Sequence, residues 1–245
     1  MSVIRPLDLV RVSRRLMVLQ SSWCEGSMQA EGLAYGISPG LRRIYEDPEE
    51  LAQAIRRYHI TFNTHPFLTG VVAGAILKME QAGEDPKKID LFIKTTMGPL
   101  AAFGDPFFKG ALSPFVGVLS VVSALCLGPA AGVIALLVIF NAVHLFVRFK
   151  GILVGFRAGD QALLMVAKWI GPTRTNIIKT ATAVLAGSFF VLVALKFDST
   201  IDTWAVLLTG SFGLVCALLL IKKRSLSVYM APALILVIIL LEVFA

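Results

Sequence analysis

The chain has 245 residues, of which 56% are hydrophobic and only 16% are charged. Soluble domains usually carry about 25% charged residues, so the composition argues against an ordinary soluble globular protein. The formal net charge of +7 does not indicate nucleic-acid binding, because basic residues on the cytoplasmic loops of a membrane protein give the same sum.

The first part of the chain has the pattern of amphipathic helices. Apolar residues recur at helical spacing over 7–20 and over 49–62, and Asp47 is placed to cap the second of these helices. A third helical stretch covers 66–82, and a fourth begins at Pro86. Basic amphipathic helices of this kind either lie on the cytoplasmic membrane surface or pack against a partner subunit. The sequence leaves both alternatives open.

Residues 94–108 predict a helix that is broken twice. Gly98-Pro99 ends a helix because the proline ring prevents its continuation. Gly104-Asp105-Pro106 restarts it, with Asp105 as the capping residue. A carboxylate this close to the bilayer is costly and tends to mark a substrate path or a buried partner, and Lys94 is the candidate partner across a hairpin. The segment therefore predicts either a site for a polar solute or a simple capped helix start.

Two further polar motifs are candidates for function. Asn63 and His65 come before Pro66 at a corner between two helices, where they either cap backbone amides or bind a solute or a partner subunit. Asn141 and His144 are three residues apart and therefore share one face of a helix. Hydrogen bonding between helices is the simpler explanation for this second pair.

Several chemistries lack a motif in this chain. The sequence has no phosphate-binding glycine-rich loop of ATPases, no Cys/His cluster with metal-ligand spacing and no nucleophile elbow. We therefore expect no metal, no cofactor and no catalytic residues. Glu80 and Glu84 are predicted to be solvated charges on a helix surface.

The second part of the chain is predicted to be embedded in a membrane. The apolar stretch 110–147 is too long for one span of about 20 residues, and Gly128-Pro129 divides it. The predicted hydrophobic segments are approximately 110–127, 130–147, 176–195, 204–221 and 226–243. The predicted fold is an all-α polytopic membrane protein forming one integral unit, with amphipathic helices and the broken segment in 1–106 and membrane segments in 107–245.

Lysines and arginines set the expected orientation. They cluster between the second and third hydrophobic segments and again between the fourth and fifth, whereas the loop between the third and fourth carries Asp198 and Asp202. The basic loops and the N-terminus are therefore expected on the cytoplasmic side and the C-terminus outside.

The motifs in combination resemble the IID component of mannose-family sugar phosphotransferase systems. The similarity extends over almost the whole chain, in the same order, and rests on Arg42-Arg43-Ile44-Tyr45, Ala54-Ile55-Arg56-Arg57-Tyr58-His59, Asn63-Thr64-His65-Pro66-Phe67, Met97-Gly98-Pro99-Leu100-Ala101, Gly104-Asp105-Pro106 and Phe140-Asn141. The resemblance implies a bacterial inner-membrane subunit that forms a hetero-oligomer with a IIC subunit and translocates a hexose-type sugar. It also implies cytoplasmic IIA and IIB units that relay phosphate to the sugar.

Candidate residues for sugar binding or translocation are Asn63, His65, Lys94, Asp105 and Asn141, with Gly98, Pro99, Gly104 and Pro106 as the helix-breaking positions. Mannose, fructose, sorbose and amino-sugar systems share these motifs, so the sequence does not identify the sugar. Three other functions compete with this one. They are a self-contained secondary transporter, which the missing second inverted half disfavours, a membrane enzyme using Asp105 and His65 as acid and base, and a non-transporting membrane scaffold.

Overall fold

The computed structural model describes residues 3–196. The predicted segments 204–221 and 226–243, the loop with the two aspartates and the C-terminus lie outside the described residues. Within 3–196 the secondary structure is helical, apart from isolated β-bridges that pair Met28 with Cys24 and Phe62. The helices are α1 (Pro6–Arg15), α2 (Ala30–Ile44), α3 (Pro48–Arg56), α4 (Thr69–Gln81), α5 (Pro86–Phe107), α6 (Ser113–Leu127), α7 (Pro129–Ala158), α8 (Ala162–Ile170) and α9 (Pro172–Lys196), with short 3₁₀ turns at Leu16–Val18 and Gly159–Gln161 and a π-helical turn at Phe108–Leu112.

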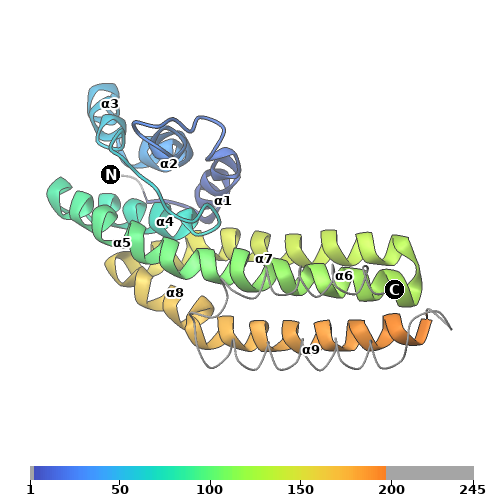
Figure 1. Cartoon of the computed structure of the whole chain (residues 1–245). Coiled ribbons are helices and arrows are strands. Elements are labelled where there is room, and N and C mark those ends of the chain that lie inside the picture. The colour runs from blue at the N-terminus through green and yellow to red at the C-terminus, as the bar shows by residue number, and fades with distance from the viewer. Residues whose placement is uncertain (1–2, 197–245) are drawn as a thin grey trace.

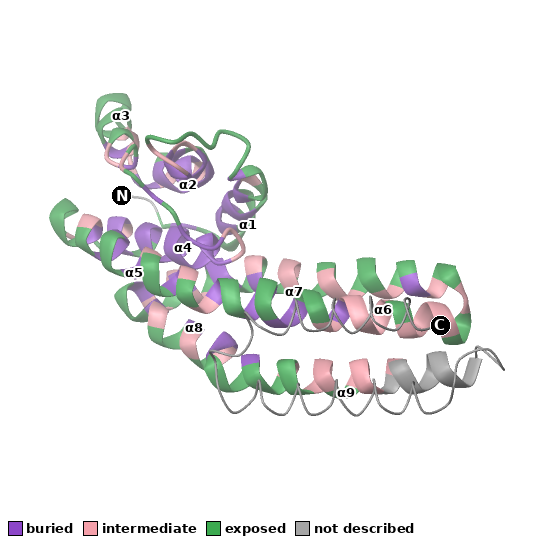
Figure 2. Cartoon of the chain, viewed as in Figure 1, coloured by how far each residue is buried: buried purple, intermediate pink, exposed green. Residues whose placement is uncertain are grey.

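The helices form two regions of different character (Figure 1). Helices α1 to α4 gather at one end of the molecule, together with the last turns of α7, which pack against α4. Helices α6 and α7 extend away from this end as an apolar hairpin, and α9 runs alongside α6. Helix α5 leads from the first region into the hairpin. In Figure 2, α2 and α4 are mostly buried and α3 is mostly exposed, whereas the hairpin is mostly exposed or half-buried.

Helices α4 and α7 pack closely because glycines lie between them. A β-carbon at Gly74 would lie 2.2 Å from the carbonyl oxygen of Ile152, and one at Gly155 would lie 2.0 Å from that of Val71. Real side chains do not approach backbone atoms so closely, so these positions require glycine. The Gly-x-x-x-Gly spacing of 70–74 and 151–155 is the sequence signal for this contact.

The sequence pattern missed helix α2. Glycines and Pro39 occur within it, and these residues normally lower helix propensity. The glycines instead allow close packing, because a β-carbon at Gly32 would lie 2.0 Å from the carbonyl oxygen of Leu19. Burial of Leu33, Ile37 and Leu41 on this helix compensates for its weak propensity. Helix α8 was not predicted either.

The predicted double break in 94–108 is wrong. Helix α5 continues through Gly98-Pro99 and through Gly104-Asp105-Pro106. The backbone hydrogen bonds change from the α-helical to the π-helical pattern only at Phe108–Leu112. Pro99 only removes the N–H that would bond to the carbonyl of Thr95, and the helix continues past it. The hydroxyl of Thr64 donates to the carbonyl of Met97 at 3.0 Å and so attaches α5 to the loop before α4. The π-helical turn ends two residues before Pro114, which lacks the N–H that would continue the α-helical hydrogen bonds.

Other predicted boundaries are confirmed. The carboxylate of Asp47 accepts from the N–H of Glu50 at 3.0 Å, and that of Asp85 accepts from Lys87 at 2.9 Å, so both residues cap their helices. Gly128 separates α6 from α7 with a φ of 99°. Helix α7 continues beyond the predicted end at 147 to Ala158.

Two helical stretches in the described part of the chain are long and apolar enough to cross a membrane, Pro86–Leu127 and Pro129–Gly187. The predicted segment 110–127 falls in the first of them, and 130–147 and most of 176–195 fall in the second. The total of five segments stays a prediction.

Glu80 is not the solvated charge that the sequence predicted. Its carboxylate is only 2% exposed and accepts hydrogen bonds from Arg57 at 2.8 Å, from the Tyr45 hydroxyl at 2.5 Å and from the Tyr58 hydroxyl. Burial, together with this carboxylate, raises the pKa of both tyrosines. The prediction failed because the partners come from the residues just after α2 and just after α3, which spacing on one helix does not show. The side chain of Glu84 is 36% exposed and pairs with Lys88 at 2.9 Å.

Candidate functional site at the base of the hairpin

The loop between α3 and α4 is fixed by a buried side-chain amide. The Nε2 of Gln29 donates to the carbonyl of Thr64 at 2.9 Å, and its Oε1 accepts from the N–H of the same residue at 3.1 Å. The Gln29 N–H also donates to the carbonyl of Phe62 at 2.8 Å. Together with the bond from Thr64 to α5, these contacts fix the position of the next residue, His65.

The His65 side chain is buried against α5. A β-carbon at Gly104 would lie 2.4 Å from the Cβ of His65, so only glycine at 104 allows the imidazole to sit against the helix. The ring is 3% exposed and stacks on Phe108 with 4.8 Å between ring centroids. Gly104 therefore serves as a packing position for His65 and not as a helix break.

Hydrogen bonding assigns the protonation of His65. Its Nδ1 accepts from the N–H of Phe67 at 3.3 Å, so the neutral ring carries its proton on Nε2. The Nε2 lies 3.9 Å from Oδ1 of Asp105, which exceeds a hydrogen-bond distance. Burial lowers the pKa of His65 to about 4; the Asp105 carboxylate opposes this shift, and Lys109 and Arg148 add to it. His65 is therefore a neutral donor at pH 7.

Asp105 is accessible at the end of α5. It lies inside the helix, so the prediction that it caps a helix start is wrong. Its side chain is 52% exposed, and its Oδ1 pairs with the Nζ of Lys109 one turn later at 3.1 Å. The structure thus joins a carboxylate, an ammonium and an imidazole where α5 enters the π-helical turn; π-helical turns often occur at functional sites.

Aromatic rings form one wall of this corner. Phe67 lies between Phe108, His144 and Arg148, at 4.8 Å, 4.7 Å and 4.8 Å from its ring centroid. The Nε2 of His144 lies 2.9 Å from Oδ1 of Asn141. Asn141, a predicted site residue, therefore reaches the corner only indirectly, through the ring of His144 that stacks on Phe67. Phe67, Phe108 and Lys109 were not among the predicted site residues. The spacing of Lys109 four residues after Asp105 was the available signal.

Two predicted site residues are arranged differently. Asn63 is exposed, two residues before His65. Lys94 pairs with Asp90 at 2.6 Å and not with Asp105, because Lys94 and Asp90 lie one turn apart on α5. Lys94 instead lines a hollow together with Arg57 and the start of α5.

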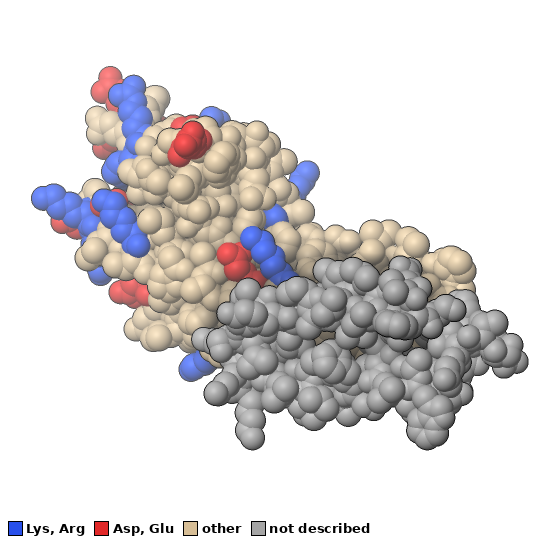
Figure 3. All heavy atoms as spheres, viewed as in Figure 1, with Lys and Arg blue, Asp and Glu red and all other residues tan. Residues whose placement is uncertain are grey.

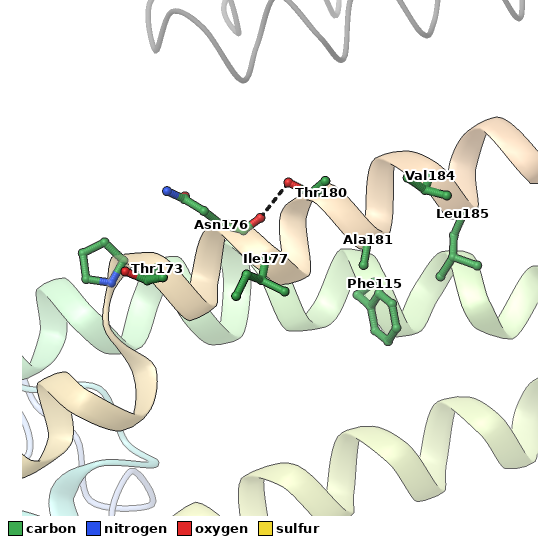
Figure 4. Close-up of a pocket in the computed structure, with 9 residues that line it drawn as sticks. Phe115, Thr173, Asn176, Ile177, Thr180, Ala181, Val184 and Leu185 are labelled. Atoms are coloured by element: carbon green, nitrogen blue, oxygen red, sulfur yellow. Dashed lines mark hydrogen bonds between the residues drawn. The ribbon is translucent and has the colours of Figure 1, made fainter.

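One groove in the described part of the chain is lined mostly by apolar side chains. It has a volume of about 880 Å³ and lies between α6 and α9 (Figure 4). Its lining residues are Phe115, Pro172, Thr173, Asn176, Ile177, Thr180, Ala181, Val184 and Leu185. None of them is ionisable, and the hydroxyl of Thr180 donates to the carbonyl of Asn176 within α9. We therefore place the candidate site at the corner of His65 and Asp105.

The corner offers the groups that a neutral, hydroxyl-rich solute requires. Asp105 is an accessible acceptor, Lys109 and the Nε2–H of His65 are donors, and the rings of Phe67 and Phe108 provide apolar surface. Small-molecule sites combine mostly apolar walls with a few placed polar groups in this way.

The family model and the similar sequences both identify IID components as relatives of this chain. Residues 3–196 match the family described as "PTS system mannose/fructose/sorbose family IID component". The mannose-specific EIID component of Escherichia coli K12 is 35% identical over 158 residues, which cover 62% of this chain and 56% of that protein. The sorbose-specific EIID component of Lacticaseibacillus casei is 32% identical over 188 residues, 75% of this chain and 64% of that protein. The chain thus matches little more than half the length of the first of these relatives.

Solved structures share the fold. The mannose transporter ManYZ in complex with microcin E492, determined by cryo-EM, contains a chain that matches with a TM-score of 0.62 at 24% identity, covering 98% of this chain and 96% of that one. A second solved structure, described only as a membrane protein, has a TM-score of 0.64 at 24% identity and covers 95% and 94% of the two chains. Because the family match extends over all the described residues, the chain belongs to the mannose/fructose/sorbose family of phosphotransferase-system IID components.

Proposed function

We propose that this chain is the IID subunit of a phosphoenolpyruvate-dependent sugar phosphotransferase system. With a IIC membrane subunit it forms the path by which a hexose-type sugar crosses the bacterial cytoplasmic membrane. Cytoplasmic IIA and IIB units phosphorylate the sugar during delivery. Family membership and the mannose and sorbose specificities of the relatives support this proposal.

The observation that carries the proposal is the accessible Asp105 beside the neutral His65 at the base of the apolar hairpin. Sugar hydroxyls donate to a carboxylate and accept from an imidazole N–H or an ammonium. A carboxylate near the bilayer is expensive unless it serves a substrate path or a partner. Asp105 and Lys109 are both more than half exposed, which leaves them accessible to a second membrane subunit.

The proposed orientation follows the basic residues. Arg148, Lys150 and Arg157 occupy the end of α7 that packs against α4. With basic loops on the cytoplasmic side, helices α1 to α4 are cytoplasmic and the tip of the hairpin near Gly128 faces outward. In Figure 3 charged side chains gather over the helices of the first region.

Uptake measurements test the role of Asp105. In cells that express the chain with its IIC partner, we expect Asp105→Asn to reduce uptake of labelled sugar more than tenfold, as for loss of a charge-assisted hydrogen bond worth about 1.5–3 kcal/mol, while the amount of chain in the membrane is unchanged. Asp160→Asn, an exposed aspartate outside the corner, is the matched control. Normal uptake by Asp105→Asn would remove the corner from the translocation path.

A further inference from the structure

Helix α1 has one buried apolar face, and its opposite, exposed face mixes apolar residues with arginines. Leu9 and Val12 are buried against the neighbouring helices. On the other side, Leu7 is 69% exposed, Val10 is 44% exposed and Val18, just beyond the helix, is 51% exposed. At about 100° per residue these three exposed side chains share one face. No described element covers that face.

Two arginines lie on the same exposed face, because Arg11 and Arg14 follow Leu7 by four and seven residues. A hollow of about 410 Å³ lies between α1 and α2 and is lined by Arg11, Arg14, Arg15, Val18, Tyr35 and Pro39. Arg15 is held in place, because it donates to the Ser38 hydroxyl at 2.7 Å and lies 4.7 Å above the ring of Tyr35. Arg11 pairs with Asp8 at 3.2 Å, and Arg14 has no carboxylate partner within the described part of the chain. Guanidinium groups arranged in this way match the oxygens of a phosphate.

The residue that follows α1 is hydrogen-bonded to the first charged residue of α7. Arg148 is the first charged residue after the apolar stretch 110–147, and its guanidinium donates to the carbonyl of Leu16 at 3.1 Å. In Figure 1, α1 lies on the side of the first region from which the hairpin extends. If α6 and α7 cross the bilayer, this position places α1 at the level of the lipid headgroups.

We propose that the hollow between α1 and α2 binds the phosphate of an anionic phospholipid headgroup, while Leu7 and Val10 enter the boundary between headgroups and acyl chains. Helices that mix arginine with apolar residues and lie at the edge of a membrane protein bind such surfaces. The occupant is a lipid and not a partner helix, because a hollow lined by three arginines suits phosphate better than an apolar side chain. The inference goes beyond sugar transport and uses only the membrane insertion of the hairpin from the proposed function.

Nitroxide labels on the full-length chain test where α1 lies. The chain, with its three cysteines replaced by serine, is labelled singly at Val10→Cys and reconstituted in vesicles of phosphatidylcholine and phosphatidylglycerol. The proposal expects the Val10 label to meet oxygen more often than a water-soluble nickel complex, at headgroup depth. Gln53→Cys on α3, which is exposed on the far side of the first region, is expected to behave as a fully aqueous site.

Two results would overturn the proposal. A Val10 label as aqueous as the one at Gln53 would mean that α1 faces water, and a label shielded from both reagents would mean that a protein covers α1. A label at Leu137→Cys on α7 separates these failures from failure of the proposed function. It reports deep lipid exposure if the hairpin crosses the bilayer, whatever the result at Val10.

The headgroup site is tested by the lipids retained by the purified chain. In native mass spectrometry of chain extracted from the mixed vesicles, we expect Arg14→Gln to lower retention of phosphatidylglycerol about fivefold, as for one basic residue near an anionic surface. Arg56→Gln, an equal charge change at an exposed position on α3, is expected to retain the wild-type amount. Equal retention by both variants, or displacement of the lipid by inorganic phosphate, would refute a lipid headgroup as the occupant.

Discussion

The two regions of this chain use apolar residues in opposite ways. Around α2 and α4, side chains such as Leu33 and Ile76 are fully buried, and glycines bring backbones into contact. Along the α6–α7 hairpin, Leu127 is 78% exposed and Ile134 is 61% exposed. Monomeric soluble proteins seldom expose large contiguous apolar surface. The difference indicates that the first region is stabilised by its own core, whereas the hairpin depends on lipid or a partner subunit.

The largest expected effect is at the buried carboxylate of the first region. Glu80→Ala leaves Arg57, Tyr45 and Tyr58 without their acceptor, so we expect a loss of about 3–5 kcal/mol in the free energy of unfolding. Denaturant titration of the detergent-solubilised chain measures this loss. Glu84→Ala removes an exposed pair with Lys88 and is expected to cost less than about 1 kcal/mol. Equal effects of the two changes would contradict the buried network.

The contact between α4 and α7 is the next test. Gly155→Ala forces a methyl group into the backbone at Val71, and we expect it to cost about 3 kcal/mol, as overpacking does. The fraction of monodisperse chain in size-exclusion chromatography and the unfolding midpoint report the loss. Gly117→Ala on α6, where no described residue outside the adjacent helical backbone lies within 4 Å of the added group, is expected to leave both values unchanged. Tolerance of alanine at 155 would mean that the two helices are farther apart.

The boundary between the regions is expected to respond to pH through His65. Because burial lowers its pKa from 6.5 to about 4, the unfolded chain binds a proton between these values that the folded chain does not bind. The free energy of unfolding is therefore highest above pH 6.5 and falls as pH falls toward 4, by about 2 kcal/mol between pH 7 and pH 5. Comparing unfolding curves at the two pH values measures this change.

A variant pair isolates the His65 contribution. His65→Gln is expected to remove most of the difference between the two pH values, whereas His59→Gln, at an exposed side chain, is expected to keep it. If the pH difference survives in His65→Gln, another group carries it.

The smallest expected effects come from the same substitution, valine to alanine, made once in each region. Val72→Ala removes a fully buried side chain of α4, and we expect a loss of about 1.5 kcal/mol in the free energy of unfolding. Val138→Ala on α7, where the side chain is 59% exposed, is expected to change it by less than about 0.5 kcal/mol in detergent. A large loss at Val138 would show that the hairpin packs against another part of the protein.

Local patterns in the sequence were sufficient for features that depend on neighbouring residues. The cap at Asp47, the helix start at Pro86 and the division at Gly128 followed from short-range backbone chemistry. The apolar stretches followed from composition, because a bilayer core demands a fixed length of apolar chain. The family followed from motifs in order along the chain, and His65 and Asp105 were among the predicted site residues.

Long-range contacts decided the rest. Helix α2 forms despite its glycines because neighbouring backbones pack into the space that they leave. Helix α5 continues through Pro99 and Pro106, and Thr64 of a distant loop is hydrogen-bonded to it. Glu80 is buried because partners distant in sequence meet its carboxylate, and Lys109 displaces Lys94 as the partner of Asp105 because it lies one turn away on the same chain segment. Sequence spacing determines what one element can do by itself, whereas the environment of a charge or a glycine depends on which other elements pack against it.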